Sequence, residues 1–239
     1  VLLTDEVLAV GDQSFQTKCM ERIGEMKQAG VTIVFVSHSL DSVRSLCNKS
    51  VWLDQGQVMA SGPSHEVIDA YLASVAKKDE ARLAAEAAAA QGQEGRWGTG
   101  EAAITGVIFL NAAGKESHVL FSGQPVTIRI NYRVTGRIEE PMIGVAIYRS
   151  DGIHVNGPNT RFSGYHIQHI EGEGAIDYVI ESLALLEGSY DFTAAIYDKE
   201  GLHAYDHRQR DFKFLVQRGR VGEIYGLVYM PSHCELHQP

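Results

Sequence analysis

The chain has 239 residues, of which 44% are hydrophobic, and it carries a formal net charge of −9 at pH 7. This length and composition are typical of a globular protein with one or two domains. The acidic balance argues against broad nucleic-acid binding and against a polybasic membrane patch. No apolar stretch reaches the ~18 residues of a membrane-spanning helix, and no signal peptide is visible. The cysteines are few and far apart, which favours reduced thiols in a cytosolic protein.

Two apolar runs near the start of the chain each end in polar residues. Residues 1–4 precede Asp5 and Glu6, and residues 31–36 precede Ser37 and His38. Continuous apolar runs are typical of buried parallel strands, whose carboxyl ends meet at a ligand crevice. An acid pair alone is more often a solvated turn. The second run, ending in Ser-His, favours a site in which two acids and a histidine meet.

The sequence around these residues resembles that of one protein family. The stretches DEVLAVGDQSFQTKC, VFVSHSLDSVRSLCNKSVWLDQGQV and GPSHEVIDAYL are similar to the ATP-binding subunit of ABC transporters that export O-antigen and related polysaccharides, the Wzt type. The resemblance implies ATP and Mg²⁺ as cofactors. It implies that Asp5 holds the hydration shell of Mg²⁺ in a Walker B motif, that Glu6 orients the attacking water, and that His38 senses the γ-phosphate. Asp12 matches the loop that crosses to the partner's nucleotide site.

The phosphate-binding part of such an ATPase has no counterpart in this sequence. The pattern G-x-x-x-x-G-K-[ST] occurs nowhere in the 239 residues, and the Leu-Ser-Gly-Gly-Gln type of signature is absent too. The chain opens with Val1 inside a strand-like run, so we expect a fragment truncated at its N-terminus. The parent protein is then expected to be a transport-coupled ATPase, and this fragment to be inactive alone.

Helical and strand signals alternate through the first third of the chain. Apolar residues at a spacing of three to four predict a helix that ends at Gly30, and a short helix follows the second strand. Residues 51–60 are typical of a hairpin, and another helix begins near Ser64. These signals predict an α/β unit over residues 1–76, which the resemblance identifies as the C-terminal part of an ABC nucleotide-binding domain.

Residues 77–100 are predicted to form a linker. Helical propensity continues through an alanine-rich stretch that has too few large apolar residues to bury a core. Gly92, Gly95, Gly98 and Gly100 then interrupt the helix.

Residues 101–239 change to an alternating period. Val126, Ile128 and Ile130 share one face of a half-buried antiparallel strand, and similar patterns recur near residues 176–180, 190–196 and 212–216. About seven to nine short strands separated by turns predict an all-β immunoglobulin-like sandwich. The last predicted strand is 223–229, whose apolar residues make it a poor exposed edge and predict a homodimer, with exchange of this strand as one route.

One polar and aromatic segment of the sandwich is a candidate ligand site. It contains side chains that can stack on a sugar face or bond sugar hydroxyls, namely Asn159, Thr160, Arg161, Phe162, Tyr165 and His166. On composition alone, a turn with two core aromatics explains the segment equally well. The segments SGQPVTIRINYRV, YRSDGIHVNGPNTRF and LLEGSYDFTAAIYD resemble the C-terminal glycan-binding module of O-antigen exporters, which favours the glycan interpretation.

The expected function is therefore that of an ABC exporter subunit that couples ATP hydrolysis to polysaccharide export and recognises the glycan through its C-terminal domain. The resemblance implies a transmembrane permease as partner and a peripheral position on the cytoplasmic side of the inner membrane, without nucleic acid. The alternatives are a non-catalytic glycan-binding, dimerisation or docking module, and the ATPase of a capsule or teichoic acid exporter. A two-carboxylate glycosidase is not favoured, because such acids are usually solvated loop charges and sequence spacing does not give the separation that the mechanism requires.

Overall fold

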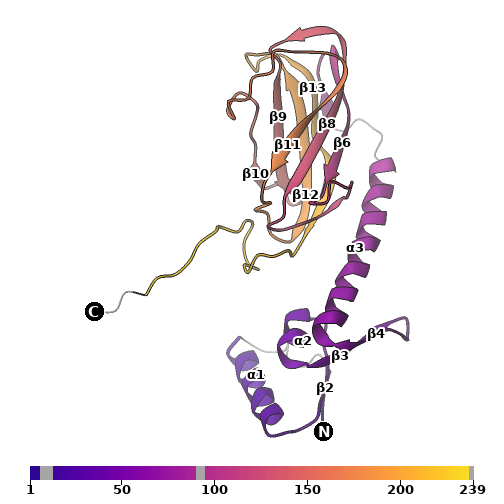
Figure 1. The fold of residues 1–239 in the computed structure, drawn as a ribbon, viewed down its shortest axis with the longest axis vertical. Coiled ribbons are helices and arrows are strands. Elements are labelled where there is room, and N and C mark those ends of the chain that lie inside the picture. Colours follow the sequence, from indigo (N-terminus) through magenta and orange to yellow (C-terminus); the bar gives the residue numbers. More distant parts are fainter. Residues whose placement is uncertain (6–12, 90–94, 237–239) are drawn as a thin grey trace. The chain divides into compact units, whose positions relative to one another are not determined.

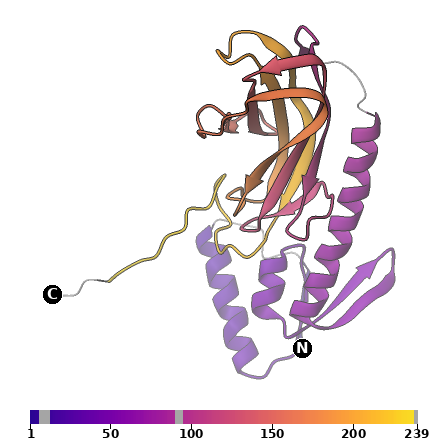
Figure 2. The ribbon, with the colours of Figure 1, turned by 45° about the horizontal axis from the view of Figure 1, so that its top comes forward.

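A computed structural model describes residues 1–5, 13–89 and 95–236 (Figures 1 and 2). These residues divide into two compact units, Val1–Lys77 and Lys78–Pro239. In the described residues, no helix is both long and apolar enough to cross a membrane.

The first unit begins with the two predicted strands. Strand β1 (Leu2–Asp5) pairs in parallel with β2 (Ile33–Val36), and their ends place Asp5 beside Val36. Helix α1 (Gln13–Gln28) lies between them in sequence, and α2 (Leu40–Leu46) follows, capped by the Ser39 side chain, which accepts from the Ser42 amide. The predicted order of strand, helix, strand and helix is therefore observed.

A hairpin and a long helix complete this part of the chain. Strands β3 (Lys49–Asp54) and β4 (Gln57–Pro63) are joined by Gln55 and Gly56, both with positive φ. The Trp52 ring forms a T-shaped pair with the ring of Tyr71, a residue of helix α3 (Ser64–Ala89). As predicted, α3 continues through the alanine-rich stretch, because alanine loses little side-chain entropy in a helix.

The apolar strands of the first unit are less buried than predicted. Side chains alternate between half-buried and exposed along β1 and β2, and Leu3, Val34 and Val36 are exposed. The physical reason is that the sheet has two strands, so in the described residues one of its faces has no covering layer.

The second unit contains two sheets in which most neighbouring strands are antiparallel. One sheet has the order β10-β9-β12-β13-β5, with β7 added in parallel beside β13. The other has the order β11-β8-β6. The bounds are β5 (Arg96–Trp97), β6 (Ala102–Leu110), β7 (Val119–Phe121), β8 (Val126–Glu139), β9 (Met142–Arg149), β10 (His154–Asn156), β11 (His169–Ile180), β12 (Gly188–Tyr197) and β13 (Ala204–Gln217).

Both sheets contribute to one hydrophobic core, so the second unit is a β-sandwich and the mostly β prediction is confirmed. Val126, Ile128 and Ile130 on β8 are buried, as their alternation predicts. They share the core with an aromatic cluster in which Phe109 lies 5.9 Å from Phe192 between ring centroids. Such a cluster of large apolar side chains supplies most of the free energy that holds the two sheets together.

Two segments differ from the sequence prediction. Residues 96–97, inside the predicted linker, form β5 and pair with β13. The predicted strand 223–229 is wrong, because these residues form no strand and the structure records only a single bridge between Val228 and Leu185. An apolar composition favours a strand only where a neighbouring strand edge offers a row of backbone hydrogen-bonding groups. Residues 223–229 lie beside such an edge for three residues at most.

Candidate functional site

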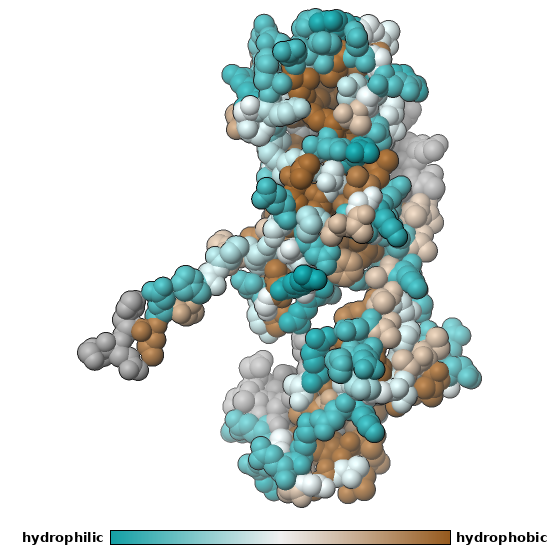
Figure 3. Space-filling model, in the orientation of Figure 1, coloured by the Kyte–Doolittle hydropathy of each residue, from teal (hydrophilic) through white to brown (hydrophobic). Residues whose placement is uncertain are grey.

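The sandwich opens into a cleft of about 440 Å³ where edge strand β11 faces β9. Its size falls within the ~300–1,000 Å³ range of small-ligand sites. In Figure 3, apolar side chains are visible among hydrophilic ones on the face where β9 and β11 lie. The cleft is lined by Arg129, Ile130, Ile143, Val145, Pro158, Asn159, Thr160, Ser163, Tyr165, Ala175, Ile176, Asp177 and Tyr178.

The segment 157–166 forms one wall of the cleft because it is bonded to the edge of β9. The Val145 amide donates to the Pro158 carbonyl at 3.0 Å, and the Thr160 amide donates to the Ile143 carbonyl at 2.9 Å. The Thr160 hydroxyl accepts a third bond from the Ile143 amide at 3.1 Å. These bonds satisfy the edge of β9 and hold the wall in a fixed position.

A tight turn orients the side chains of this segment. The Asn159 side-chain oxygen accepts from the Phe162 amide at 2.8 Å, and the Tyr165 amide donates to the Thr160 carbonyl at 2.9 Å. Gly164 has a φ of +70°, which an L side chain would adopt only with strain. The turn uses the Asn159 oxygen internally and leaves its amide nitrogen as the group that can donate to a ligand.

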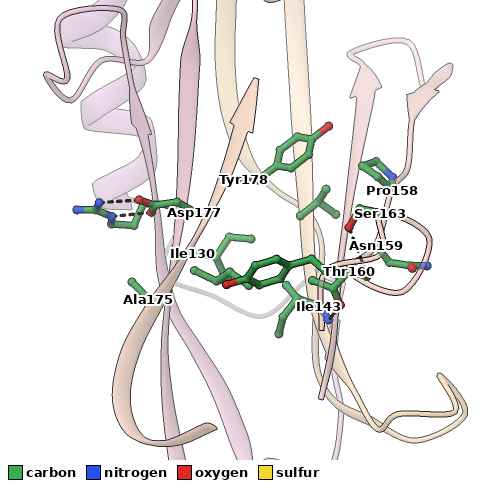
Figure 4. A pocket seen from close by; sticks show the side chains of 13 residues that line it. Ile130, Ile143, Pro158, Asn159, Thr160, Ser163, Ala175, Asp177 and Tyr178 are labelled. Atoms are coloured by element: carbon green, nitrogen blue, oxygen red, sulfur yellow. Dashed lines mark hydrogen bonds and ion pairs between the residues drawn. The ribbon is translucent and has the colours of Figure 1, made fainter. Parts of the chain in front are cut away.

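The floor of the cleft is apolar. Figure 4 shows Ile130, Ile143 and Tyr178 directed into the space between the two sheets. Burial raises the pKa of the Tyr178 hydroxyl, and its side-chain hydrogen bond with Asn156 opposes that rise. Tyr178 is therefore a neutral hydrogen-bonding group at the end of an apolar surface.

A bidentate ion pair forms the charged rim of the cleft. The Arg129 guanidinium donates through Nε and Nη2 to the two Asp177 oxygens, each at 2.8 Å (Figure 4). These hydrogen bonds from Arg129 hold the pKa of Asp177 below its ordinary value. The pair is fixed by two parallel bonds, a geometry that single-contact lysine pairs lack.

A second hollow of about 420 Å³ shares the Thr160 and Tyr165 wall with the cleft. Here the His166 Nε2 lies 3.3 Å from a Glu140 carboxylate oxygen, and the Lys199 Nζ lies 3.8 Å from the other. The structure thus places five of the six predicted ligand residues in two hollows. Asn159, Thr160 and Tyr165 line the cleft, while Thr160, Arg161, Tyr165 and His166 line the second hollow.

Two of the predicted aromatic residues have different positions. Tyr165 is 63% exposed, so it is not one of the core aromatics that the alternative interpretation requires. Phe162 is 81% exposed and lines neither hollow, because the turn at Asn159 directs it outward. Sequence reasoning missed the floor residues, above all Tyr178, because their alternation is the same as that of core residues.

The residues expected to act on ATP are only partly described. Asp5 ends β1, and the parallel pairing places it at the same edge as Ser37 and His38, which follow β2. Glu6 and Asp12 lie outside the described residues. Because the sequence holds no phosphate loop, Asp5 and His38 by themselves do not fit a complete MgATP site. Within the described part of the chain, no group of three or more His, Cys, Asp or Glu residues could hold a metal ion.

Comparison with protein families gives one match over most of the sandwich. Residues 93–230 match a family described as the Wzt C-terminal domain. A crystal structure of the C-terminal domain of Wzt superimposes with a TM-score of 0.53 at 17% identity, covering 61% of this chain and 90% of that one. At this identity the superposition shows a shared fold.

Three similar proteins have names that describe them as export ATP-binding proteins. The O-antigen export system ATP-binding protein RfbB of Myxococcus xanthus is 28% identical over 210 residues, 84% of this chain and 48% of that protein. RfbB of Klebsiella pneumoniae is 43% identical over 76 residues, covering 32% of this chain and 31% of that protein. The teichoic acids export ATP-binding protein TagH of Bacillus anthracis is 48% identical over 71 residues, 30% and 13% respectively. The chain therefore spans half or less of the length of these relatives.

Proposed function

The chain belongs to the Wzt C-terminal domain family, and from this premise we propose that its sandwich binds the polysaccharide carried by an exporter. The glycan lies in the cleft between β11 and β9. The observation that carries this proposal is the composition of the cleft, which combines an apolar floor with fixed polar groups at its rim. A sugar ring has an apolar face and a polar edge, so it needs both kinds of surface in one place.

Each part of the cleft has a role in this proposal. Tyr165 supplies an exposed aromatic face for stacking, and Tyr178 supplies a neutral hydroxyl beside the apolar floor. The Arg129 and Asp177 pair and the Asn159 amide bond sugar hydroxyls. Existing hydrogen bonds hold these polar groups in fixed positions, so a ligand whose hydroxyls do not match their remaining donors and acceptors forms fewer bonds, which makes the site selective.

The first unit contributes the end of a nucleotide-binding domain in the parent protein. In the parent, with MgATP bound, Asp5 would hold the hydration shell of Mg²⁺, Glu6 would position water, His38 would contact the γ-phosphate and Asp12 would reach the partner subunit. The exposed apolar side chains of Leu3, Val34 and Val36 support this role, because a surface of that kind is normally covered by further structure. ATP hydrolysis belongs to the parent, with a homodimeric pair of these subunits bound to a transmembrane permease at the inner membrane.

A second candidate function is assembly without glycan recognition. The C-terminal segment exposes Ile224, Tyr225 and Met230, which favours a protein contact there. Some relatives are named for teichoic acids export, so the exported polymer in this second candidate is either an O-antigen or a teichoic acid.

The test of the proposal is a calorimetric titration of the chain with the host bacterium's surface polysaccharide. It is carried out for the wild type and for a Tyr165→Ala variant. We expect the substitution to weaken binding by roughly 1–3 kcal/mol, because it removes a stacking surface. The melting temperature stays nearly unchanged, because Tyr165 is 63% exposed.

The matched control is Phe162→Ala, which removes an aromatic ring from the same turn but from outside both hollows. It should leave the affinity close to that of the wild type. Equal affinities for the wild type and Tyr165→Ala, with both proteins folded, would refute the cleft as the glycan site.

A further inference from the structure

A second aromatic surface lies at the other edge of the six-stranded sheet. Trp97, on β5, is 53% exposed, although tryptophan is usually well buried. Strands β12 and β13 separate β5 from β9, so the two edges lie about 14 Å apart at ~4.8 Å per strand. Trp97 is therefore outside the cleft described above.

The Trp97 ring is held in one orientation. It stacks on His207 with ring centroids 4.8 Å apart and an angle of 15° between the planes. The His207 ring is fixed in turn by a 2.8 Å hydrogen bond between its Nδ1 and the Tyr197 hydroxyl. One face of the indole is thus covered by His207, and its exposed area is presented on a rigid support.

The backbone around Trp97 is fixed as firmly as the ring. Arg96 donates two bonds, of 3.0 and 2.9 Å, to Asp206, which is only 3% exposed and also accepts from the Ile104 amide at 2.6 Å. At Gly98, φ is +142° and an added Cβ would lie 2.4 Å from the Tyr205 carbonyl oxygen. A strand of two residues with this many contacts is pre-organised, which lowers the entropy cost of binding a ligand.

The surroundings of the ring decide which ligand fits. A hollow of about 310 Å³ is lined by Arg96, Trp97, Gly98, Gly100, Tyr205 and Asp206. Apart from the indole and the Tyr205 ring, this lining is polar or backbone, whereas a protein interface has a larger apolar centre. Two aromatic rings among hydrogen-bonding groups match a hydrated ring-shaped ligand.

We propose that Trp97 and this hollow form a second carbohydrate contact, in which a sugar ring of the polysaccharide stacks on the exposed part of the indole. The proposal rests on the function proposed above, because it takes the same polymer as ligand. A repeating polymer that occupies the cleft and the Trp97 surface together binds more tightly than through either one, since the second contact forms at a high effective concentration.

The chain offers a direct readout, because it contains two tryptophans, Trp52 and Trp97. In a Trp52→Phe variant of this 239-residue chain, Trp97 is the sole source of tryptophan fluorescence. Titration with the host bacterium's surface polysaccharide should shift the Trp97 emission to shorter wavelength and reduce its quenching by acrylamide. Both changes should persist when Tyr165→Ala is added, because the Trp97 contact does not need the cleft.

A second measurement compares ligand lengths. Trp97→Ala should weaken binding of the long polymer by tenfold or more and leave binding of a single repeat unit to the cleft unchanged. Trp97→Phe, which keeps an aromatic face, should recover part of the lost affinity.

The outcomes separate the two proposals. If the polysaccharide leaves the Trp97 emission unchanged while Tyr165→Ala weakens binding, the Trp97 contact is refuted and the cleft stands. If Trp97 responds and Tyr165→Ala has no effect, the cleft is refuted. A response of Trp97 to the detergent-solubilised permease, and none to polysaccharide, would instead identify a protein contact and overturn the inference.

Discussion

Asp206 is the buried charge on which the position of β5 depends. It accepts both bonds of Arg96 and the Ile104 amide, and so joins β5, β6 and β13. We expect Asp206→Asn to lower the free energy of unfolding by about 1.5–3 kcal/mol, because it replaces charge-assisted hydrogen bonds with weaker neutral ones in a buried place. Urea denaturation of the full chain measures this loss.

The control for that prediction is Glu173→Gln on the outer face of β11. Glu173 pairs with Arg133 at 2.7 Å, but both side chains are mostly exposed, so the pair is worth about 0–1 kcal/mol. Similar losses in the two variants would show that Asp206 contributes no more than a surface ion pair.

At the level of single residues, the sequence locates the candidate site better than it orients the side chains. The mixture of amide, hydroxyl and aromatic groups at 159–166 identifies a wall of the cleft. It cannot show that Phe162 points outward, because that follows from the hydrogen bond between its amide and Asn159. Nor can it separate Tyr178 from a core residue, because cleft and core lie on the same face of an alternating strand.

At the level of helices and strands, the length of an element decides whether the sequence predicts it. Strand β8 (Val126–Glu139) repeats its alternation often enough to be recognised. Strand β5 has two residues between glycines, so no period exists, and its place is set by pairing with β13. The error at 223–229 has the opposite cause, since apolar residues are present there but a long partner edge is missing in the described residues.

The Trp97 ring on β5 stacks on His207 of β13, and this contact should make the stability of the protein depend on pH. Burial lowers the pKa of His207 below its ordinary value of 6.5, and the nearby Asp206 charge opposes this shift. As pH falls below about 6.5, the unfolded chain therefore takes up the proton first. The stability that neutral His207 contributes is present above that pH and is lost as pH falls toward the lower pKa of the folded state.

Urea midpoints at pH 7.5 and 5.5, for the wild type and His207→Gln, test this dependence. The variant should lose less stability between the two pH values, because it has no proton to take up at this position. The same loss in both proteins would mean that other groups, and not His207, produce the pH effect.

For the whole molecule, the sandwich, and not the first unit, is the part that the sequence predicts in most detail. Its core alternation is repeated on several strands, so one misplaced strand does not change the architecture. The first unit shows the predicted elements but leaves Leu3, Val34 and Val36 exposed. A pattern of apolar residues predicts that a face is covered, but it does not say by which part of the protein.

Exposure at the end of the chain leads to a prediction about assembly. Residues Ile224 and Tyr225 are exposed, Tyr225 by 87%, and the segment after β13 contacts the sandwich through bonds such as that from the Leu186 amide to the Leu227 carbonyl at 2.9 Å. We expect the chain to form a dimer through this segment, because two-fold pairing covers the same apolar surface on both copies.

Sedimentation of the full chain at high micromolar concentration measures the state of assembly. The wild type should sediment as a dimer, and the double substitution Ile224→Asp with Tyr225→Asp should shift it to a monomer, because two charges on each copy would have to lose their water in the contact. The matched control is Leu202→Asp, which places a charge on another exposed apolar residue, in the turn between β12 and β13. A monomeric wild type contradicts the prediction outright. A dimer that Leu202→Asp dissociates, and that the double substitution leaves intact, would move the contact to the turn between β12 and β13.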